Sequence, residues 1–459
     1  MNGLGATKRV VSGLQEGTAS APCGVGEESV VRRSKALISA AGLAVVALVA
    51  APALAAAPMG PAPAVLPSTE SAASGIPQGI APVLDPLLQD PSLGGSVGAV
   101  VIDVVSGQIV YQREAATPRS LASNDKILTA LAVLNLVGPE TRIETTVVAG
   151  AGSVTIVGAG DPTLATVSAD GSSLTELADQ TAAVTEGAVA VHYDTSLFAG
   201  SQTAPGWDGD YPALGVAAPV SSLTVDRSRV PDSDSRVDDP AYVAAQRFAD
   251  LLSERGITVT EVTPSSASGE VIASTRSVPV ATMIETMLTE SDNDSAEILA
   301  HLAGAQLTGV GTFESGAQAT METLQSLGLP ISGTVIVDGS GLSYANVTSP
   351  NLLASAVSLA AGQAAPSWTW PLLLGLPVAG LTGTLADRFV GAETAAAAGF
   401  VRAKTGTLIE VSTLSGTVVD RDGRLLAFAF MSDATTDIPD SRVALDRAAA
   451  ALAACGCLN

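Results

Sequence analysis

The chain has 459 residues and a formal charge of −23, from 22 basic and 45 acidic side chains. Phosphate backbones repel so acidic a protein, which argues against nucleic acid as a partner. Hydrophobic residues make up 47% of the chain and charged residues 15%, so a large packed core is expected and disorder of the whole chain is excluded.

The N-terminal region carries the pattern of an export signal. Arg32, Arg33 and Lys35 precede a long apolar run that ends in small residues and an Ala-x-Ala pattern, as in secretory signal peptides. The run approaches the length of a membrane span before Pro52, so an uncleaved anchor helix is the alternative. We expect a disordered extension at 1–34, a signal peptide or anchor at 35–57, and a Pro- and Ala-rich linker at 58–82.

The next part, residues 83–139, combines a hairpin with a helix. Two strand-like stretches, SVGAVVID and GQIVYQRE, meet at a Ser-Gly turn and predict a β-hairpin. Apolar residues then recur at helical spacing, and Gly138 marks the end of this helix. Ser123 therefore lies at the N-terminus of the helix, and Lys126 lies one turn further on nearly the same face.

The remaining chain divides into two parts. Residues 140–275 contain short segments rich in Val, Thr, Gly and Asp, such as TTVVAG and GAVAVHYD, which indicate an inserted β-rich domain. A helix over DPAYVAAQRFADLLSERGI is expected to close this domain. In residues 276–459, VATMIETML and SAEILAHLAGAQL predict helices, FVRAKTGT, VSTLSGTVV and LLAFAFMSD predict a strand meander, and SRVALDRAAAALAA predicts a terminal helix.

Histidine and cysteine are too few, and wrongly spaced, for a metal site. His192 and His301 are the two histidines, and Cys455 and Cys457 stand in the terminal ACGCLN, so no zinc-binding spacing exists and no metal is expected. Both histidines are expected to be structural. The two C-terminal thiols are equally compatible with a strained disulfide and with free thiols.

The scarcity of lysine points to a catalytic base. The chain has four lysines, and Lys126 and Lys404 are the two downstream of the export signal. The chain has two histidines, and this scarcity disfavours a Ser-His-Asp hydrolase. A neutral lysine can activate a serine instead, and S-x-x-K on a helix brings the amine of Lys126 within reach of the Ser123 hydroxyl. Burial can supply the required shift of roughly three pKa units, about 4 kcal/mol, whereas arginine cannot be deprotonated.

Two further motifs follow in a fixed order. SDN at 291–293 lies between two predicted helices, and KTG at 404–406 lies on a predicted strand. S-x-x-K and S-x-N are each expected about once by chance in such a chain, whereas a specified tripeptide occurs in roughly one chain in twenty. Their order therefore carries more weight than any single motif. The structural alternatives are a helix N-cap with a solvated lysine at Ser123, a helix cap at Ser291 and an edge-strand turn at Lys404.

In these motifs and their order, the sequence resembles the active-site-serine penicillin-recognising enzymes. Within them it is most similar to the D-alanyl-D-alanine carboxypeptidase and endopeptidase branch, the low-molecular-mass class C penicillin-binding proteins. The resemblance runs from about residue 90 to the C-terminus and includes VGAGDPTL at 157–164, DGSGLS at 338–343 and LPVAGLTGTLADR at 376–388. It implies a serine β-lactamase/transpeptidase-like domain of class α/β plus α, with an antiparallel sheet flanked by helices and a helical subdomain. The inserted β-rich domain then lies between the first and second motifs.

The resemblance also implies how catalysis proceeds. Ser123 is implied to be the nucleophile that a peptide ending in D-Ala-D-Ala acylates, with Lys126 taking its proton. Ser291 is implied to relay a proton to the leaving amine. The backbone N–H groups of Ser123 and Thr407 are implied to form the oxyanion hole. No metal or organic cofactor is implied.

The substrate-binding residues are implied to be Asn293, Lys404, Thr405, Gly406 and Thr407. Asn293 would bind the substrate amide, while Lys404 supplies positive charge and Thr405 a hydroxyl for its carboxylate. The expected partners are peptidoglycan stem peptides, with β-lactam antibiotics as inhibitors. We therefore expect an exported protein, extracellular or associated with the cell wall, and held by a membrane anchor if the signal is uncleaved.

Three features of the chain bear on this resemblance. Asn124-Asp125 stands where the family more often has a small hydroxyl or apolar pair, and Asp125 is expected to point away from Lys126. The insert is short for this branch, so the number of inserted domains stays open. DGSGLS is interpreted mainly as a Gly-rich turn, with a direct role for Ser340 or Ser343 as the alternative.

Two other functions compete with the peptidase. A β-lactamase on the same core needs a fast deacylating base, and the chain lacks the E-x-x-L-N stretch of class A enzymes, so a long-lived penicilloyl adduct is expected. A catalytically silent wall-binding protein could use the insert for adhesion. The intact set of Ser123, Lys126 and Lys404 argues against this last alternative.

Overall fold

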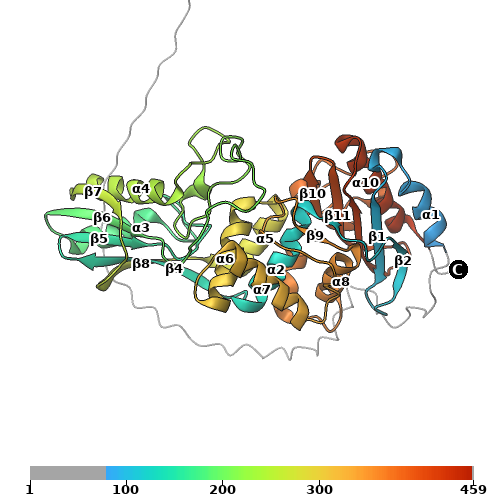
Figure 1. Cartoon of the computed structure of the whole chain (residues 1–459), viewed down its shortest axis with the longest axis horizontal. Coiled ribbons are helices and arrows are strands. Elements are labelled where there is room, and N and C mark those ends of the chain that lie inside the picture. The colour runs from blue at the N-terminus through green and yellow to red at the C-terminus, as the bar shows by residue number, and fades with distance from the viewer. Residues whose placement is uncertain (1–78, 457–459) are drawn as a thin grey trace, which may run out of the picture. The chain divides into compact units, whose positions relative to one another are not determined.

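A computed structural model describes residues 79–456 of the chain (Figure 1). The expected extension at 1–34, the signal or anchor at 35–57 and most of the linker at 58–82 lie outside these residues. Helix α1, Ile80–Leu87, begins within the last residues assigned to the linker. None of the helices in the described part of the chain is both long enough and apolar enough to cross a membrane.

The first and last parts of the folded chain share one sheet. Its strands lie in the order β10-β11-β12-β1-β2, and every neighbouring pair is antiparallel. The predicted hairpin is the β1–β2 pair, and the predicted meander is β10–β12, so both predictions are confirmed. The strands are β1 (Val97–Asp103), β2 (Ile109–Arg113), β10 (Val401–Leu408), β11 (Val411–Val419) and β12 (Leu425–Ser432).

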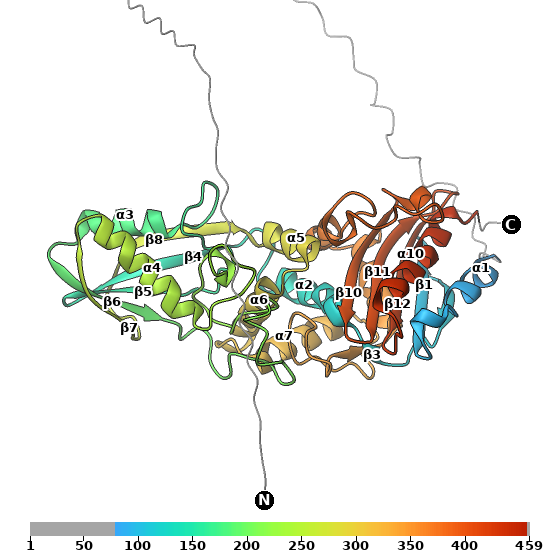
Figure 2. The ribbon, with the colours of Figure 1, turned by 90° about the horizontal axis from the view of Figure 1, so that it is seen from above.

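Helices cover both faces of this sheet (Figures 1 and 2). On one face, the predicted terminal helix α10 (Ile438–Ala454) packs with α1 on a core that contains Phe428 and Phe430 of β12. On the other face, α8 (Pro350–Ala361) packs on Ala427 and Ala429 of the same strand. The alternation along β12 follows from the two-residue period of a strand, and it makes both faces apolar.

A helical subdomain adjoins the α8 face. Helix α2 (Asp125–Leu136) contacts α5, α6, α7, α8 and α9, and its residues from Asp125 to Leu134 are all buried. A helix surrounded in this way is apolar over most of its circumference, and the few polar side chains on it therefore need a reason. The surrounding helices are α5 (Val280–Glu290), α6 (Asn293–Thr308), α7 (Phe313–Ser326) and α9 (Trp370–Gly375).

The inserted part forms a second, mixed sheet in the order β7-β6-β5-β4-β8. Strand β6 pairs in parallel with both β5 and β7, and parallel neighbours need a crossover connection. Helix α3 lies in the connection from β5 to β6, and α4 lies in the connection from β6 to β7. The expectation that α4 closes the domain is wrong, because β7 and β8 follow it and β8 passes the boundary expected at 275. The elements are β4 (Arg142–Gly150), β5 (Ser153–Val157), α3 (Leu174–Val184), β6 (Ala188–Asp194), α4 (Pro240–Glu254), β7 (Thr258–Pro264) and β8 (Glu270–Pro279).

Between β6 and α4 the chain runs through residues 195–239, here named the connecting segment. Its one short helical turn is η3 (Asp226–Ser228), and its Phe198 and Trp207 pack with Ile298 of α6 and Phe313 of α7. The insert is therefore joined to the helical subdomain by side-chain packing as well as by the chain. The other short elements are η1 (Pro91–Leu93), β3 (Arg119–Ser120), η2 (Ala122–Asn124), β9 (Val347–Thr348), η4 (Ser367–Thr369), η5 (Gly383–Leu385) and η6 (Ala395–Ala397).

The predicted fold class is confirmed by this architecture. An antiparallel sheet lies between helices, a helical subdomain adjoins it, and a separate β-rich sheet is inserted between the S-x-x-K helix and the S-x-N motif. Three chain segments far apart in sequence, at α2, α6 and β10, are thereby brought together.

Candidate active site

Lys126 lies in the first turn of α2, and Ser123 lies in η2 directly before that helix, so the two residues are one helical turn apart as predicted. Ser123 follows Ala122, whose positive φ of 46° places a strained residue directly before the serine. The Nζ atom of Lys126 lies 3.1 Å from the Ser123 Oγ, 2.7 Å from the Asn293 Oδ1 and 2.7 Å from the Ser340 carbonyl oxygen. The amine thus joins the first motif, the second motif and the DGSGLS turn.

The environment of Lys126 favours the neutral amine. Its side chain is fully buried, and this burial lowers the pKa of Lys126 to about 8. Four carboxyl groups oppose the effect of burial: those of Glu297, Asp338, Asp292 and Asp125 each raise the pKa. The balance leaves a substantial neutral fraction near pH 8, which a general base requires.

Ser291 and Lys404 form a second contact. Ser291 lies between α5 and α6 in the left-handed conformation, with φ of 59° and ψ of 37°. Lys404 on β10 is fully buried and donates to the Ser291 Oγ and to the Thr405 carbonyl oxygen, both at 2.8 Å. Burial and, to a smaller extent, the charge of Lys126 hold the pKa of Lys404 well below its ordinary value. The two lysines are therefore electrostatically linked.

The KTG strand is shaped to pass close to η2. A Cβ added to Gly406 would lie 2.2 Å from the Thr413 Oγ1 and 2.8 Å from the Leu121 carbonyl oxygen, so glycine is required there. The Thr405 hydroxyl lies 2.8 Å from the Thr384 hydroxyl. The Thr407 hydroxyl accepts from Arg442, outside the predicted site, at 3.2 Å. β10 is the edge strand of its sheet, so alternate backbone N–H groups face away from β11.

Two acidic residues of the site were not found from the sequence. Buried Glu297 accepts the backbone N–H groups of Gly339 at 3.0 Å and Ser340 at 2.7 Å, and this holds the turn whose carbonyl oxygen accepts from Lys126. Burial and the nearby Asp338 raise the pKa of Glu297 to about 8. Its spacing of one helical turn from Asn293 on α6 was the available signal.

Asp338 organises the DGSGLS turn itself. Its carboxylate accepts from the backbone N–H groups of Gly341 and Ser343 and from the side chains of Asn346 and Trp207. The sequence interpretation of DGSGLS as a turn is therefore correct, but the turn also supplies an acceptor to Lys126. Its contribution is made by a backbone carbonyl group, which a side-chain motif does not reveal.

Asp125, the unusual residue of the first motif, is fully buried. Both of its carboxyl oxygens lack a hydrogen-bond partner in the described structure. Burial, followed by the charges of Asp338 and Glu297, raises the pKa of Asp125 well above its ordinary value. A neutral Asp125 avoids the cost of an unpaired buried charge.

The histidines make local contacts. The His192 Nδ1 atom lies 2.9 Å from the Thr263 Oγ1 within the inserted sheet. The His301 Nδ1 atom lies 2.8 Å from the Glu297 carbonyl oxygen, and burial lowers the pKa of His301 to about 4. No group of three or more potential metal-ligating side chains occurs within residues 79–456. Cys455 is disulfide-bonded.

A family model described as the D-Ala-D-Ala carboxypeptidase 3 (S13) family matches residues 80–236 and 228–452. The chain belongs to this family. The match spans the inserted domain as well as the three motifs, so the family resemblance of this S13 carboxypeptidase includes the insert.

Curated relatives agree with the S13 assignment. The chain is 35% identical over 409 residues to a protein named carboxypeptidase DacB from Mycolicibacterium smegmatis, covering 86% of this chain and 88% of that one. It is 30% identical over 438 residues to a D-alanyl-D-alanine carboxypeptidase from Actinomadura sp. strain R39, covering 76% and 80%. The crystal structure of penicillin-binding protein 4 from Haemophilus influenzae matches with a TM-score of 0.67 at 20% identity, covering 80% of this chain and 97% of that one. This last likeness supports the fold.

Proposed function

We propose that this S13 carboxypeptidase removes the terminal D-Ala from peptidoglycan stem peptides through an acyl-enzyme on Ser123. The observation that carries the proposal is the buried Lys126 amine, 3.1 Å from the Ser123 Oγ and with a pKa lowered to about 8. The family assignment and the relatives named carboxypeptidase support the substrate class. The N-terminal signal pattern supports an exported enzyme that reaches the cell wall.

The hydrogen bonds around Lys126 give the base a defined direction. A neutral amine has two N–H donors and one lone pair. The two shorter contacts, at 2.7 Å to the Asn293 Oδ1 and at 2.7 Å to the Ser340 carbonyl oxygen, use the two N–H groups. The lone pair is then left to face the Ser123 hydroxyl at 3.1 Å. Asn293 and the Ser340 carbonyl group thus orient the base.

The remaining motif residues complete the proposed acylation step. The Ser123 Oγ bonds to the carbonyl carbon before the terminal D-Ala as its proton passes to Lys126, and the C–N bond then breaks as Ser291 relays that proton from Lys126 to the leaving amine. The backbone N–H groups of Ser123 and Thr407 stabilise the oxyanion. Water then hydrolyses the ester and releases the shortened peptide and free Ser123.

Lys404 is proposed to bind the substrate carboxylate together with Thr405. Its amine contacts one hydroxyl and one carbonyl oxygen and forms no ion pair with a carboxylate among the described residues. A bound C-terminal carboxylate would supply that counter-charge and raise the pKa of Lys404. Asn293 would bind the peptide amide, and cleavage of cross-linked stem peptides would use the same acyl-enzyme.

β-Lactam antibiotics are proposed to acylate the same serine. A structure of the Haemophilus influenzae penicillin-binding protein 4 in complex with a β-lactam matches this chain with a TM-score of 0.62, which supports a shared fold. The absence of an E-x-x-L-N stretch argues for slow deacylation. The adduct is therefore expected to persist.

Mass spectrometry after penicillin treatment tests the nucleophile. We expect one penicilloyl group on the wild-type protein, located on Ser123, and none on Ser123→Ala. The wild-type protein should release D-Ala from a D-Ala-D-Ala peptide, whereas Ser123→Ala should not. Label on Ser123→Ala, or wild-type protein without label and without D-Ala release, would contradict the proposal.

A further inference from the structure

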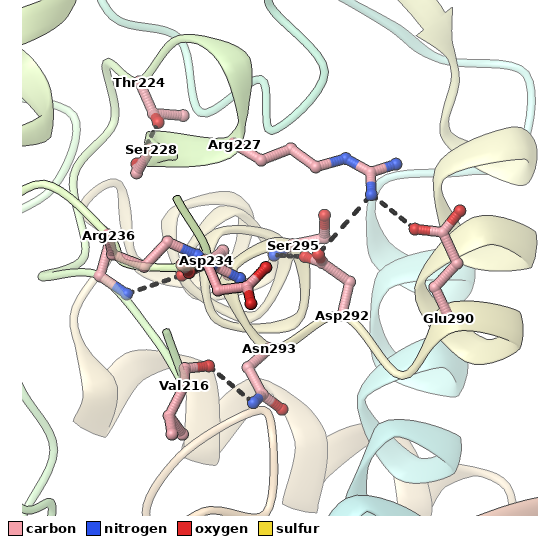
Figure 3. Close-up of polar contacts among 12 residues, drawn as sticks. Val216, Thr224, Arg227, Ser228, Asp234, Arg236, Glu290, Asp292, Asn293 and Ser295 are labelled. Carbon is pink, nitrogen blue, oxygen red and sulfur yellow. Dashed lines mark hydrogen bonds and ion pairs between the residues drawn. The ribbon is translucent and has the colours of Figure 1, made fainter. Parts of the chain in front are cut away.

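The connecting segment contacts Asn293 of the second motif and the residues that flank Ser291 and Asn293. Figure 3 shows Arg227 and Arg236 beside the chain that leads into α6, and the Asn293 side chain turned toward Val216. The contacted residues run from Glu290 to Asp294 and enclose Ser291. We name these contacts the motif-two clamp.

The first half of the clamp is made by Arg227. This residue lies in a turn of three successive non-glycine residues in the left-handed region, with φ of 50°, 55° and 55° at Asp226, Arg227 and Ser228. Such backbone strain persists only where surrounding contacts hold it, and it is concentrated at functional sites. The Asp226 carboxylate holds the turn by accepting from the Thr166 backbone N–H at 2.9 Å and its hydroxyl at 2.6 Å.

The strained turn directs Arg227 to both neighbours of Ser291. The Arg227 Nη1 atom lies 2.5 Å from the Glu290 Oε2 and 3.8 Å from the Asp292 Oδ2. The Asp292 carboxylate also caps α6 by accepting from the Ser295 backbone N–H at 2.6 Å. Arg227 therefore links the two residues that flank the left-handed Ser291.

The second half of the clamp acts on Asn293. The Arg236 Nε atom lies 2.6 Å from the Asp294 Oδ2, and both side chains are buried. The other Asp294 oxygen accepts from the Ala218 backbone N–H at 2.7 Å, so the chain at 216–218 is fixed against the start of α6. The Val216 carbonyl oxygen then accepts from the Asn293 Nδ2 at 2.8 Å.

This contact decides which way the Asn293 amide faces. Because the Nδ2 group donates to the Val216 carbonyl, the Oδ1 atom is turned to Lys126, whose Nζ lies 2.7 Å away. A flipped amide would place donors against the donors of Lys126. The inserted domain thus acts on Lys126 indirectly: the Val216 carbonyl group orients Asn293, and Asn293 contacts Lys126.

We propose that the motif-two clamp makes Arg227 and Arg236 positioning residues for acylation, holding Ser291 and orienting Asn293 so that the Lys126 lone pair faces Ser123. The inference rests on the proposed function. It assigns to the insert a part in catalysis, in contrast to a role confined to adhesion.

Acylation rates of four variants with labelled penicillin test the clamp. Arg227→Gln is expected to slow acylation at least roughly tenfold, because small misplacements of catalytic groups are costly in rate. Arg236→Gln should show a similar loss, and Arg236→Lys should recover part of it by restoring the charge opposite Asp294. Arg255→Gln is the matched control, since its ion pair with Asp179 at 2.6 Å lies within the inserted domain and touches no motif residue.

The pH profile separates positioning from stability. In Arg236→Gln a released Asn293 no longer stabilises the Lys126 ammonium, so the acid limb of the acylation profile should move to lower pH while the plateau rate falls. Thermal unfolding gives the folded fraction for each variant. The substitution changes none of the charged and titratable groups that face Lys126: Asp125, Asp292, Glu297, Asp338 and Lys404.

The outcomes are distinguishable. Slower acylation with a shifted acid limb, and a control that matches wild type, supports the clamp. Wild-type rates per folded molecule in Arg227→Gln and Arg236→Gln, or an unmoved acid limb, overturn it and leave the proposed function intact. A wild-type protein that takes no label overturns the proposed function and this inference with it.

Discussion

Lys126, the proposed base, is held by contacts with three segments of the chain: the Ser123 hydroxyl, the Asn293 side chain and the Ser340 carbonyl oxygen. Its contact with Ser123 could be predicted, because a separation of three residues on a helix fixes both side chains on one face. Its contacts with Asn293 and Ser340 could not be predicted, because they depend on how three distant segments pack. Glu297 was missed for the same reason.

The first prediction concerns the charge of Lys126. Since the proposed base Lys126 must be neutral to act and burial lowers its pKa to about 8, acylation of the wild-type protein should rise with pH through that value. Lys126→Arg cannot deprotonate near this pH and should acylate at least about 100-fold more slowly. Stopped-flow measurement with a fluorescent penicillin from pH 6 to pH 9 checks both statements, and thermal unfolding checks that the variant is folded. A pH-independent wild-type rate, or a folded Lys126→Arg with wild-type kinetics, contradicts the assigned base.

A second prediction concerns Glu297. Its two carboxyl oxygens accept two backbone N–H groups, whereas the amide of Glu297→Gln offers one oxygen and turns a donor toward the other N–H. One buried donor is then unsatisfied, so the variant should lose about 1–3 kcal/mol of unfolding free energy. Urea unfolding measures this loss. The exposed Glu322→Gln on α7 makes the same chemical change and should stay within about 0.5 kcal/mol of wild type; equal effects in both variants would count against the role of Glu297.

At the scale of elements, the strands and helices of the main sheet were predictable because each carries its own period. The hairpin, the meander and the terminal helix all follow from local pattern. The error at α4 has a physical cause: a helix between parallel strands has the same amphipathic pattern as a helix that ends a domain. The parallel pairing of β6 with β7 is decided by tertiary packing, which the helix pattern does not record.

A third prediction belongs to β10. Gly406→Ala places a methyl group 2.2 Å from the Thr413 Oγ1 and 2.8 Å from the Leu121 carbonyl oxygen, so β10 must move away from η2. We expect a loss of roughly 1–3 kcal/mol in stability and slower acylation, because Thr407 moves with the strand. Gly95→Ala, which meets nothing within 4 Å, is the control for the Gly-to-Ala change itself. Stability and acylation unchanged in Gly406→Ala would show that this close approach is not required.

At the scale of the whole molecule, the insert and the helical subdomain meet around His301 of α6. Its ring lies 5.1 Å from that of Phe198 in the connecting segment and 4.6 Å from that of Phe313 on α7, between centroids. The sequence predicted that an inserted domain exists and that His301 is structural. It did not predict the connecting segment, because residues 195–239 contain almost no regular element whose period could be recognised.

The last prediction follows from the burial of His301. Burial lowers its pKa from 6.5 to about 4 in the folded protein, so the unfolded chain binds a proton that the folded protein excludes. The stability contributed by the neutral ring is therefore present above pH 6.5 and is lost as the pH falls toward 4. Between pH 7 and pH 5 the loss should be about 2 kcal/mol. His301→Gln removes this dependence, so its unfolding free energy should fall less than that of wild type over the same range. Other groups, Glu297 among them, titrate in both proteins, so their contributions cancel when the unfolding free energies of the two proteins are subtracted. Parallel slopes for the two proteins in urea unfolding would show that the ring between the two domains is not held neutral.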